Sequence, residues 1–128
     1  MSKEGFLTLM GAVFLGALGQ ISIKAGVMHL KDAFGENLSI PLILQNPVRV
    51  LLSPWILGGF TAYAFSSLIW LTLASRYRLS LIYPMVAMGY VFVVLGSIVV
   101  FHDRPTIYTW IALTFIVVGV SLLAKTGG

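Results

Sequence analysis

Four long apolar stretches, separated by charged residues or histidine, take up most of the 128 residues of this chain. The stretches are Gly5–Ile23, Val50–Ser75, Leu79–Phe101 and Pro105–Ala124. A helix needs about 20 mostly apolar residues to cross ~30 Å of hydrocarbon, and all four stretches are close to or above that length. We therefore predict an all-α membrane protein in which residues 1–128 form a single domain, a bundle of four transmembrane helices. The expected helices cover about residues 4–29, 48–75, 80–101 and 105–124, and the second begins near Pro47 or Pro54, since either proline suits a first turn.

The composition agrees with this class and excludes several functions. The chain is 59% hydrophobic and 9% charged, which is unlike a soluble globular protein or a disordered one. It has no cysteine, so disulfides, thiol catalysis and thiolate metal sites are excluded. His29 and His102 are isolated, and the sequence contains no serine–histidine–acid set, P-loop or nucleotide fingerprint. We expect no enzyme activity, no metal, no cofactor and no nucleic-acid partner.

The connectors between the predicted helices are short. Arg76–Arg78 is so brief that the second and third helices must be antiparallel neighbours. The segment Ser39–Pro47 is apolar but too short to span, and prolines bracket it. We expect it to lie in the membrane interface as a short helical turn. Four helices hardly enclose a sizeable solute path, so we also expect the protein to act as a dimer.

The lysine and arginine residues are divided almost evenly between the two sides of the predicted membrane. Lys3, Arg76, Arg78 and Lys125 lie on one side, and Lys24, Lys31, Arg49 and Arg104 lie on the other. If Lys24 is counted as intramembrane, the positive-inside rule leans weakly towards cytoplasmic termini. The balance leaves two alternatives open, a single orientation and insertion in both orientations.

Acidic residues are missing from the interior of all four stretches. Glu4, Asp32, Glu36 and Asp103 lie at helix ends or in loops. Proton-coupled transport usually depends on an intramembrane carboxylate, which can exchange a proton for a cation. The sequence therefore argues against simple proton/drug antiport.

Lys24 is the one cation near the interior of the first stretch. It lies about 20 residues, or roughly 30 Å, along the helix from Glu4, which places it near the far headgroup level. One interpretation is a lysine that snorkels at the interface. The other is a contact for a phosphate at the mouth of a cavity, shared with Gln20 one turn earlier. We expect Ser22 to bond to its own helix.

The second and third stretches carry polar and aromatic side chains at helical spacing. Tyr63, Ser66, Ser67 and Trp70 form one stripe on the second helix. Such a stripe serves either interhelical hydrogen bonding or a cavity wall that stacks against a sugar or an organic cation. Tyr83 and Tyr90 are seven residues apart on the third helix and face the same way.

Pro84 cannot donate to the carbonyl group of Ser80, so we expect the helix to be kinked or loosened at its Ser80 end. With Gly89, it could form a hinge for alternating access, although a merely tolerated proline remains an alternative. In the fourth stretch, Ala112 and Gly119 are seven residues apart. Small residues on one face predict close packing, which here would be a dimer interface.

The chain resembles the drug/metabolite transporter superfamily over nearly its whole length. The resemblance rests on residues 73–90, LASRYRLSLIYPMVAMGY, and on residues 110–120, WIALTFIVVGV. Asn46-Pro47, Tyr63, Trp70 and the Phe101-His102-Asp103 segment also match, as do Gly19, Gln20 and Lys24 in the first helix. Asp103 stands where the family usually has glutamate, which keeps the charge.

Two groups of four-helix members resemble this chain. The small multidrug resistance proteins are antiparallel dimers driven by protons through a glutamate in helix 1, and alignment places that glutamate at Gly16. This loss argues against proton-coupled drug export. The aminoarabinose–undecaprenyl-phosphate flippase subunits are more similar, because this chain shares their Tyr83-Pro84-Met85 element and Gln20 and lacks the coupling acid.

The resemblance implies a multi-pass protein of the bacterial inner membrane that translocates a polyprenyl-phosphate-linked sugar, as a homodimer or with a similar four-helix subunit. The candidate substrate-binding residues are Lys24, Gln20, Tyr63, Ser66, Trp70, Tyr83 and Tyr90. Pro84 and Gly89 are the candidate hinge, and Ala112 and Gly119 the candidate dimer interface. The alternatives are an exporter of small molecules of the multidrug resistance type and a non-transporting partner subunit.

Overall fold

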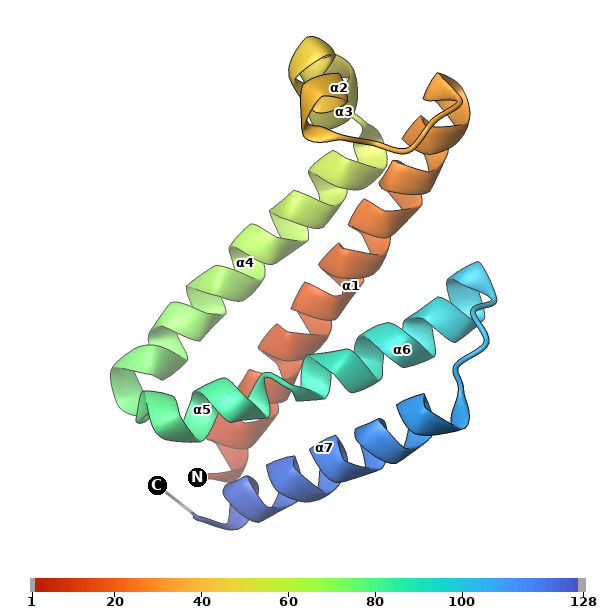
Figure 1. Ribbon diagram of the computed structural model, residues 1–128. Coiled ribbons are helices and arrows are strands. Elements are labelled where there is room, and N and C mark those ends of the chain that lie inside the picture. The colour runs from red at the N-terminus through yellow and green to blue at the C-terminus, as the bar shows by residue number, and fades with distance from the viewer. Residues whose placement is uncertain (1, 127–128) are drawn as a thin grey trace.

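The computed structural model describes residues 2–126 of the chain, and all of its regular elements in that range are helices (Figure 1). In chain order they are α1 (Lys3–Phe34), α2 (Ile40–Gln45), α3 (Pro47–Leu51), α4 (Pro54–Arg76), α5 (Leu79–Met85), α6 (Met88–Phe101) and α7 (Ile107–Thr126). Within the described residues, four segments are long and apolar enough to cross a membrane: α1, α4, α5 with α6, and α7. The predicted all-α, four-span class is confirmed.

The boundaries of the first two spans differ from the predicted ones. α1 continues to Phe34, beyond the expected end near residue 29, and ends where Gly35 adopts a left-handed conformation with φ 74°. The Gly35 amide then donates to the Lys31 carbonyl at 2.9 Å, which closes the last turn. α4 begins at Pro54, the later of the two expected starts and beyond residue 48, because Pro47 and Pro54 each start a helix of their own.

The third span is broken nearly two turns further along than expected. α5 is helical from Leu79 through Met85, and the break lies at Val86 and Ala87 rather than at the Ser80 end. Four amides around the break bond three residues back instead of four, at 2.8–3.1 Å: those of Val86, Ala87, Gly89 and Tyr90. Pro84 has no N–H to donate, and the tighter 3₁₀-type turn follows it directly.

α1 and α4 lie side by side at unusually short range because glycines meet on the facing surfaces. A methyl group added at Gly19 would lie 2.8 Å from the Gly59 carbonyl oxygen, and one added at Gly59 would lie 2.7 Å from the Gly19 carbonyl oxygen. The same approach lets the Ser22 hydroxyl donate to the Trp55 carbonyl oxygen at 2.6 Å. The expectation that Ser22 bonds to its own helix is therefore wrong.

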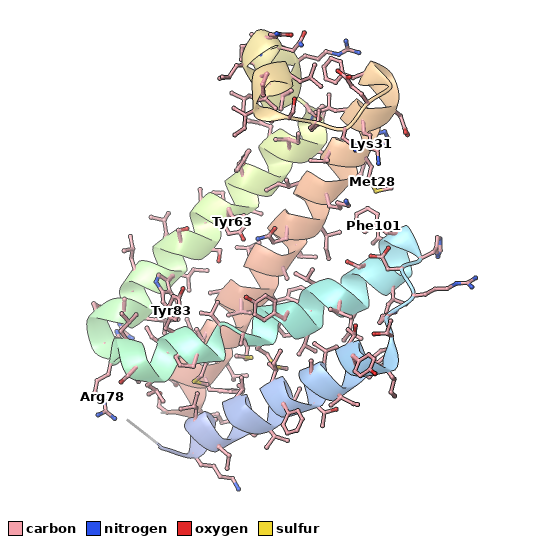
Figure 2. The ribbon with its side chains drawn as sticks, viewed as in Figure 1. Met28, Lys31, Tyr63, Arg78, Tyr83 and Phe101 are labelled. Carbon is pink, nitrogen blue, oxygen red and sulfur yellow. The ribbon has the colours of Figure 1, made fainter. Side chains whose placement is uncertain are left out.

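α6 crosses α1, with the Phe14 and Phe92 rings edge to face at 5.4 Å, and α7 packs beside α5 and α6. The larger core lies where α1, α4, α5 and α7 meet, around the fully buried Leu9, Ile82 and Met85. From that corner α4 and α6 diverge, as Figure 1 shows. Figure 2 places Arg78 at this corner and Lys31 near the other end of α1, so charged groups mark both ends of the bundle.

Candidate functional site

A cavity of about 670 Å³ lies where α4 and α6 diverge, with α1 as its floor. Its volume is in the range of small-molecule sites in proteins. The lining residues come from α1, α4, α5, α6 and the break between α5 and α6: Ala12, Val13, Gly16, Ala17, Gln20, Tyr63, Ser66, Ser67, Trp70, Tyr83, Pro84, Val86, Ala87, Gly89, Tyr90 and Val93. Six of the seven predicted substrate-binding residues are among them.

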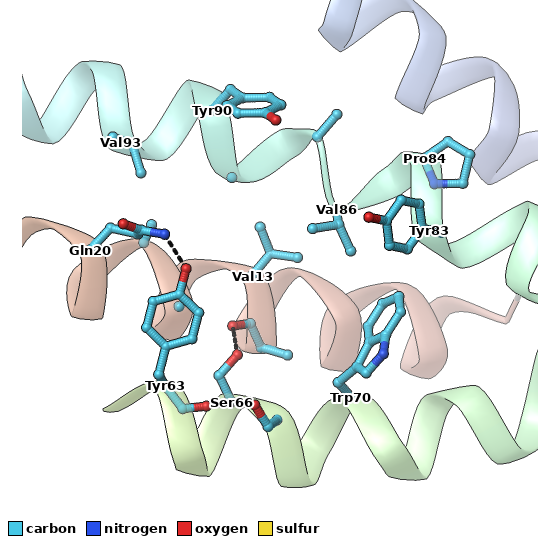
Figure 3. Close-up of a pocket in the computed structure, with 16 residues that line it drawn as sticks. Val13, Gln20, Tyr63, Ser66, Trp70, Tyr83, Pro84, Val86, Tyr90 and Val93 are labelled. Carbon is cyan, nitrogen blue, oxygen red and sulfur yellow. Dashed lines mark hydrogen bonds between the residues drawn. The ribbon is translucent and has the colours of Figure 1, made fainter. Parts of the chain in front are cut away.

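Polar contacts between α1 and α4 form one wall of the cavity (Figure 3). The side-chain amide of Gln20 donates a hydrogen bond to the Tyr63 hydroxyl. The Ser66 hydroxyl donates to the Ala12 carbonyl oxygen at 2.8 Å. The interhelical hydrogen bonding expected of the polar stripe is found at Tyr63 and Ser66, and the residues of the stripe also line the cavity. The pairing satisfies groups that would otherwise be costly in lipid.

Aromatic rings form the other side of the cavity. Trp70 on α4 and Tyr83 on α5 lie with ring centroids 6.4 Å apart and planes at 68°, an edge-to-face arrangement. Tyr90 lies on α6 and is 63% exposed, so its ring is available to a ligand rather than packed in the core. The expectation that Tyr83 and Tyr90 face the same way is consistent with their joint position in the lining.

The cavity wall carries no formal charge on any of its described lining residues. Its polar groups are phenol and serine hydroxyls, one primary amide and the indole N–H of Trp70. Hydroxyl and amide groups bind neutral, hydroxylated ligands, and aromatic faces bind sugar C–H groups or a cation. The wall is therefore suited to a sugar or an amino sugar.

Lys24 is the predicted binding residue that does not line the cavity. It is exposed and lies on α1 one turn beyond Gln20. Helical spacing puts Lys24 on the same side of α1 as Val13, Gly16 and Gln20, which line the cavity. The structure thus separates an uncharged cavity from Lys24, which lies outside its lining.

Several lining residues were not identified from the sequence. Val13, Gly16 and Ala17 recur with Gln20 at spacings of three and four residues, which is a signal the sequence contains. Val86 and Ala87 carry no such signal, because they enter the lining only through the break after Pro84. Both candidate hinge residues, Pro84 and Gly89, flank that break and line the cavity.

The predicted dimer-interface residues lie on α7, away from the cavity. Ala112 is exposed, and a methyl group added at Gly119 would meet nothing within 4 Å. Leu113 and Val120 on another side of α7 are buried. The small residues are therefore not used in packing this chain against itself.

Comparison with known proteins identifies relatives of one kind. The chain is 36% identical over 78 residues to a probable 4-amino-4-deoxy-L-arabinose-phosphoundecaprenol flippase subunit ArnE of Aeromonas hydrophila, covering 61% of this chain and 68% of that protein. It is 28% identical over 117 residues to the ArnE subunit of Pseudomonas fluorescens, covering 91% and 94% of the two chains. It is 32% identical over 95 residues to an ArnF subunit of Aeromonas salmonicida, covering 74% and 60%.

Two further comparisons found no match. No family model matches the chain, and no solved structure is significantly similar to it.

Proposed function

The chain belongs to the family of 4-amino-4-deoxy-L-arabinose-phosphoundecaprenol flippase subunits, and from this premise we propose that it moves a polyprenyl-phosphate-linked sugar between the leaflets of the bacterial inner membrane. The sugar headgroup occupies the cavity between α4 and α6, and the polyprenyl chain stays in lipid. The activity is transport, with no covalent chemistry on the sugar.

The observation that carries this proposal is the convergence of polar and aromatic residues from separate spans on one cavity. Gln20 comes from α1, Tyr63, Ser66 and Trp70 from α4, Tyr83 from α5 and Tyr90 from α6. A sugar in hydrocarbon loses its hydrogen bonds to water, at a cost of about 2–7 kcal/mol for each unpaired polar group. Hydroxyl, amide and indole groups in the wall replace part of that water, and so lower the barrier for crossing.

The amino group named in the relatives' substrate can be held without a carboxylate. A cation over a tryptophan or tyrosine face is stabilised by about 0.5–2 kcal/mol, more when water is excluded. Trp70, Tyr83 and Tyr90 present such faces to the cavity. Weak and distributed contacts of this kind suit a transporter, because the headgroup must leave the site as readily as it enters.

Lys24 is assigned to the phosphate group. It lies one turn beyond Gln20 on α1, in the direction of Lys31, which Figure 2 shows near the far end of that helix. A headgroup in the cavity, with its sugar near Gln20 and Tyr63, directs its phosphate along α1 towards this ammonium group. The polyprenyl chain then extends into the lipid between α4 and α6, and these two helices do not need to move apart to let it pass.

Pairing with a second four-helix chain completes the path in this proposal. The relatives are named as subunits, of which ArnE and ArnF are two kinds. The face of α7 that carries Ala112 and Gly119 is the surface we assign to the partner, whether an identical or a similar chain. Close approach there needs small residues, which this face supplies.

The test is a flipping assay in lipid vesicles that contain the purified protein, alone and with a similar four-helix subunit from the same cell. Polyprenyl-phosphate 4-amino-4-deoxy-arabinose is placed in the inner leaflet, and a membrane-impermeant amine reagent reports its arrival outside. We expect arrival at least 10-fold faster than in protein-free vesicles. No acceleration with either preparation contradicts the proposal.

A matched variant makes the assay specific for the cavity. Trp70→Ala removes an aromatic face from the wall, whereas Trp110→Ala removes the same side chain from α7, outside the lining. The proposal expects slow flipping only in the first variant. Release of protons on binding of small organic cations, without flipping, would instead indicate an exporter of the multidrug resistance type.

A further inference from the structure

The two short helices α2 and α3 lie between the first two spans (Figure 1), and they carry exposed apolar side chains. Ile40, Leu44 and Val48 are 74%, 72% and 67% exposed, and Leu51 and Leu52 are 51% and 61% exposed. We refer to these five residues as the outer row. Apolar side chains at this exposure are unfavourable in water, so the outer row requires an apolar or interfacial environment.

The opposite side of α2 and α3 is anchored to the bundle. Val50 and Ile56 are 5% and 3% exposed and form a small core with Leu30 of α1, against which Leu38 and Ile43 also pack. The guanidinium group of Arg49 lies over the Phe34 ring at 4.5 Å from its centroid. Because the inner side is already packed, the outer row cannot turn inwards and faces away from the protein.

The ends of α2 satisfy their own polar groups, as a backbone in a water-poor interface must. The Ser39 hydroxyl accepts a hydrogen bond from the Leu42 amide at 3.3 Å. At the other end, the Asn46 amide and side-chain Nδ2 both donate to the Leu42 carbonyl oxygen, at 3.1 and 3.2 Å. The next helix starts with Pro47, which has no amide N–H to satisfy.

The position of α2 and α3 along the bundle corresponds to the headgroup level. The contact of Ser22 with Trp55 aligns the start of α4 with a point about 20 residues, or ~30 Å, along α1. Trp55 at that point is a residue typical of membrane interfaces. Three large apolar side chains near the start of α4 are also half-exposed, at 49–52%: Trp55, Leu57 and Phe60.

From these observations we propose that α2 and α3 form an interfacial platform, in which the outer row inserts into the boundary between headgroups and acyl chains. The occupant of this surface is the lipid bilayer rather than a protein. Arg49, whose guanidinium group lies over the Phe34 ring, is part of α3 and supplies a cation for lipid phosphates. The platform fixes the depth of the bundle in the membrane.

Spin labels on single cysteines test this proposal, because the chain has no cysteine of its own. Leu44→Cys and Val48→Cys place a label on the outer row. Gln45→Cys and Asn37→Cys are matched controls at exposed polar positions of the same segment. The labelled full-length protein is measured in vesicles of phosphatidylethanolamine and phosphatidylglycerol, with oxygen as the lipid-soluble and a nickel chelate as the water-soluble relaxation agent.

We expect the ratio of oxygen to chelate collisions to be at least 3-fold higher at Leu44 and Val48 than at the two controls. Equal ratios at all four positions would place the outer row in water and overturn the proposal. Low accessibility to both agents at Leu44 and Val48 would show that a second copy or another protein covers the row, which also overturns it.

Discussion

Lys24 supplies a positive charge next to a cavity whose described lining residues are all uncharged. The lining residues supply hydroxyl, amide and aromatic groups, and the ammonium group of Lys24 lies one turn beyond them on α1. A phosphate needs a cation or several hydrogen-bond donors when it leaves water, because an unpaired charge in a water-poor site is very costly. The division between cavity and lysine matches the two chemical parts of a sugar phosphate.

Replacing Lys24 with alanine is expected to reduce flipping of the lipid-linked sugar at least 10-fold. Lys24→Arg, which keeps the charge, should retain most of the rate. Lys31→Ala is the control, since it removes a lysine two turns further along α1 and away from Gln20. The vesicle assay with the amine reagent measures all three. A wild-type rate in Lys24→Ala would remove this residue from the mechanism and favour a snorkelling role.

Changing the Gln20–Tyr63 pair in the cavity wall should have a smaller effect than removing Lys24. Tyr63→Phe removes the hydroxyl that accepts from Gln20 and leaves the ring in place. The proposal also places this hydroxyl against the sugar, and because one such hydrogen bond contributes about 1 kcal/mol, we expect substrate affinity to fall about 5-fold. Tryptophan fluorescence on titration with the glycolipid in detergent gives the affinity, in a Trp55→Phe, Trp110→Phe background that leaves Trp70 as the single tryptophan. Thr61→Val is the control, because the Thr61 hydroxyl bonds to its own helix at the Leu57 carbonyl.

At the scale of elements, the break between α5 and α6 is the feature with the clearest mechanical consequence. Amides on both sides of it bond three residues back, and its residues line the cavity. A turn with fewer regular helical bonds bends at lower cost than a continuous helix. α6 can therefore change its angle to α5 while α5 stays in the core around Ile82 and Met85.

Pro84→Ala restores the missing amide and should allow α5 and α6 to join. We expect the melting temperature to stay equal or rise, because proline inside a helix costs about 3 kcal/mol. Flipping should slow at least 5-fold while glycolipid affinity changes less than 2-fold. Pro105→Ala removes a proline outside the break and should leave both quantities unchanged. Unimpaired flipping in Pro84→Ala would identify Pro84 as merely tolerated.

The close contact of α1 with α4 predicts opposite effects for two glycine substitutions in one helix. Gly19→Ala places a methyl group 2.8 Å from the Gly59 carbonyl, so the helices must separate, and we expect a loss of about 1–3 kcal/mol of stability. Gly11→Ala meets nothing within 4 Å and should be neutral or stabilise by up to about 1 kcal/mol. Thermal unfolding in detergent measures both. Equal melting temperatures would argue against this packing.

The sequence predicted the spans and most of the cavity-lining residues, because hydropathy and helical spacing depend only on residues that are close together in the sequence. Tyr63, Ser66 and Trp70 share one side of α4 whatever surrounds them. Other features depend on how helices approach each other, which spacing does not encode. Ser22 reaches Trp55 only because glycines bring α1 and α4 together. Val86 and Ala87 enter the lining only because the break lies after Pro84 rather than before it.

At the scale of the whole molecule, the cavity is open to its surroundings, since Tyr83 and Tyr90 in its wall are 66% and 63% exposed. An open side admits a lipid-linked headgroup but does not isolate it from the bilayer. A second four-helix chain would enclose the path without changing the residues that line it here. The proposal therefore makes oligomerisation a condition of transport.

Bulky substitutions on the α7 face test that condition. Gly119→Leu and Ala112→Leu add side chains to an open face, so the fold of the single chain and its melting behaviour should be preserved. If this face contacts the partner, the added side chains prevent close approach of the two helices. We expect the dimer fraction to fall at least 5-fold, measured by native mass spectrometry of gently extracted protein, and flipping to fall in parallel.

Thr114→Leu is the matched control for these variants. It adds a similar side chain to the same helix, but Thr114 lies two residues from Ala112, about 200° around the helix, and its hydroxyl bonds only to the Trp110 carbonyl. It should leave the dimer and the flipping rate unchanged. Intact dimers in Gly119→Leu would place the partner on another face. Intact flipping by monomers would show that one chain is sufficient, because the headgroup then crosses along a cavity open to lipid.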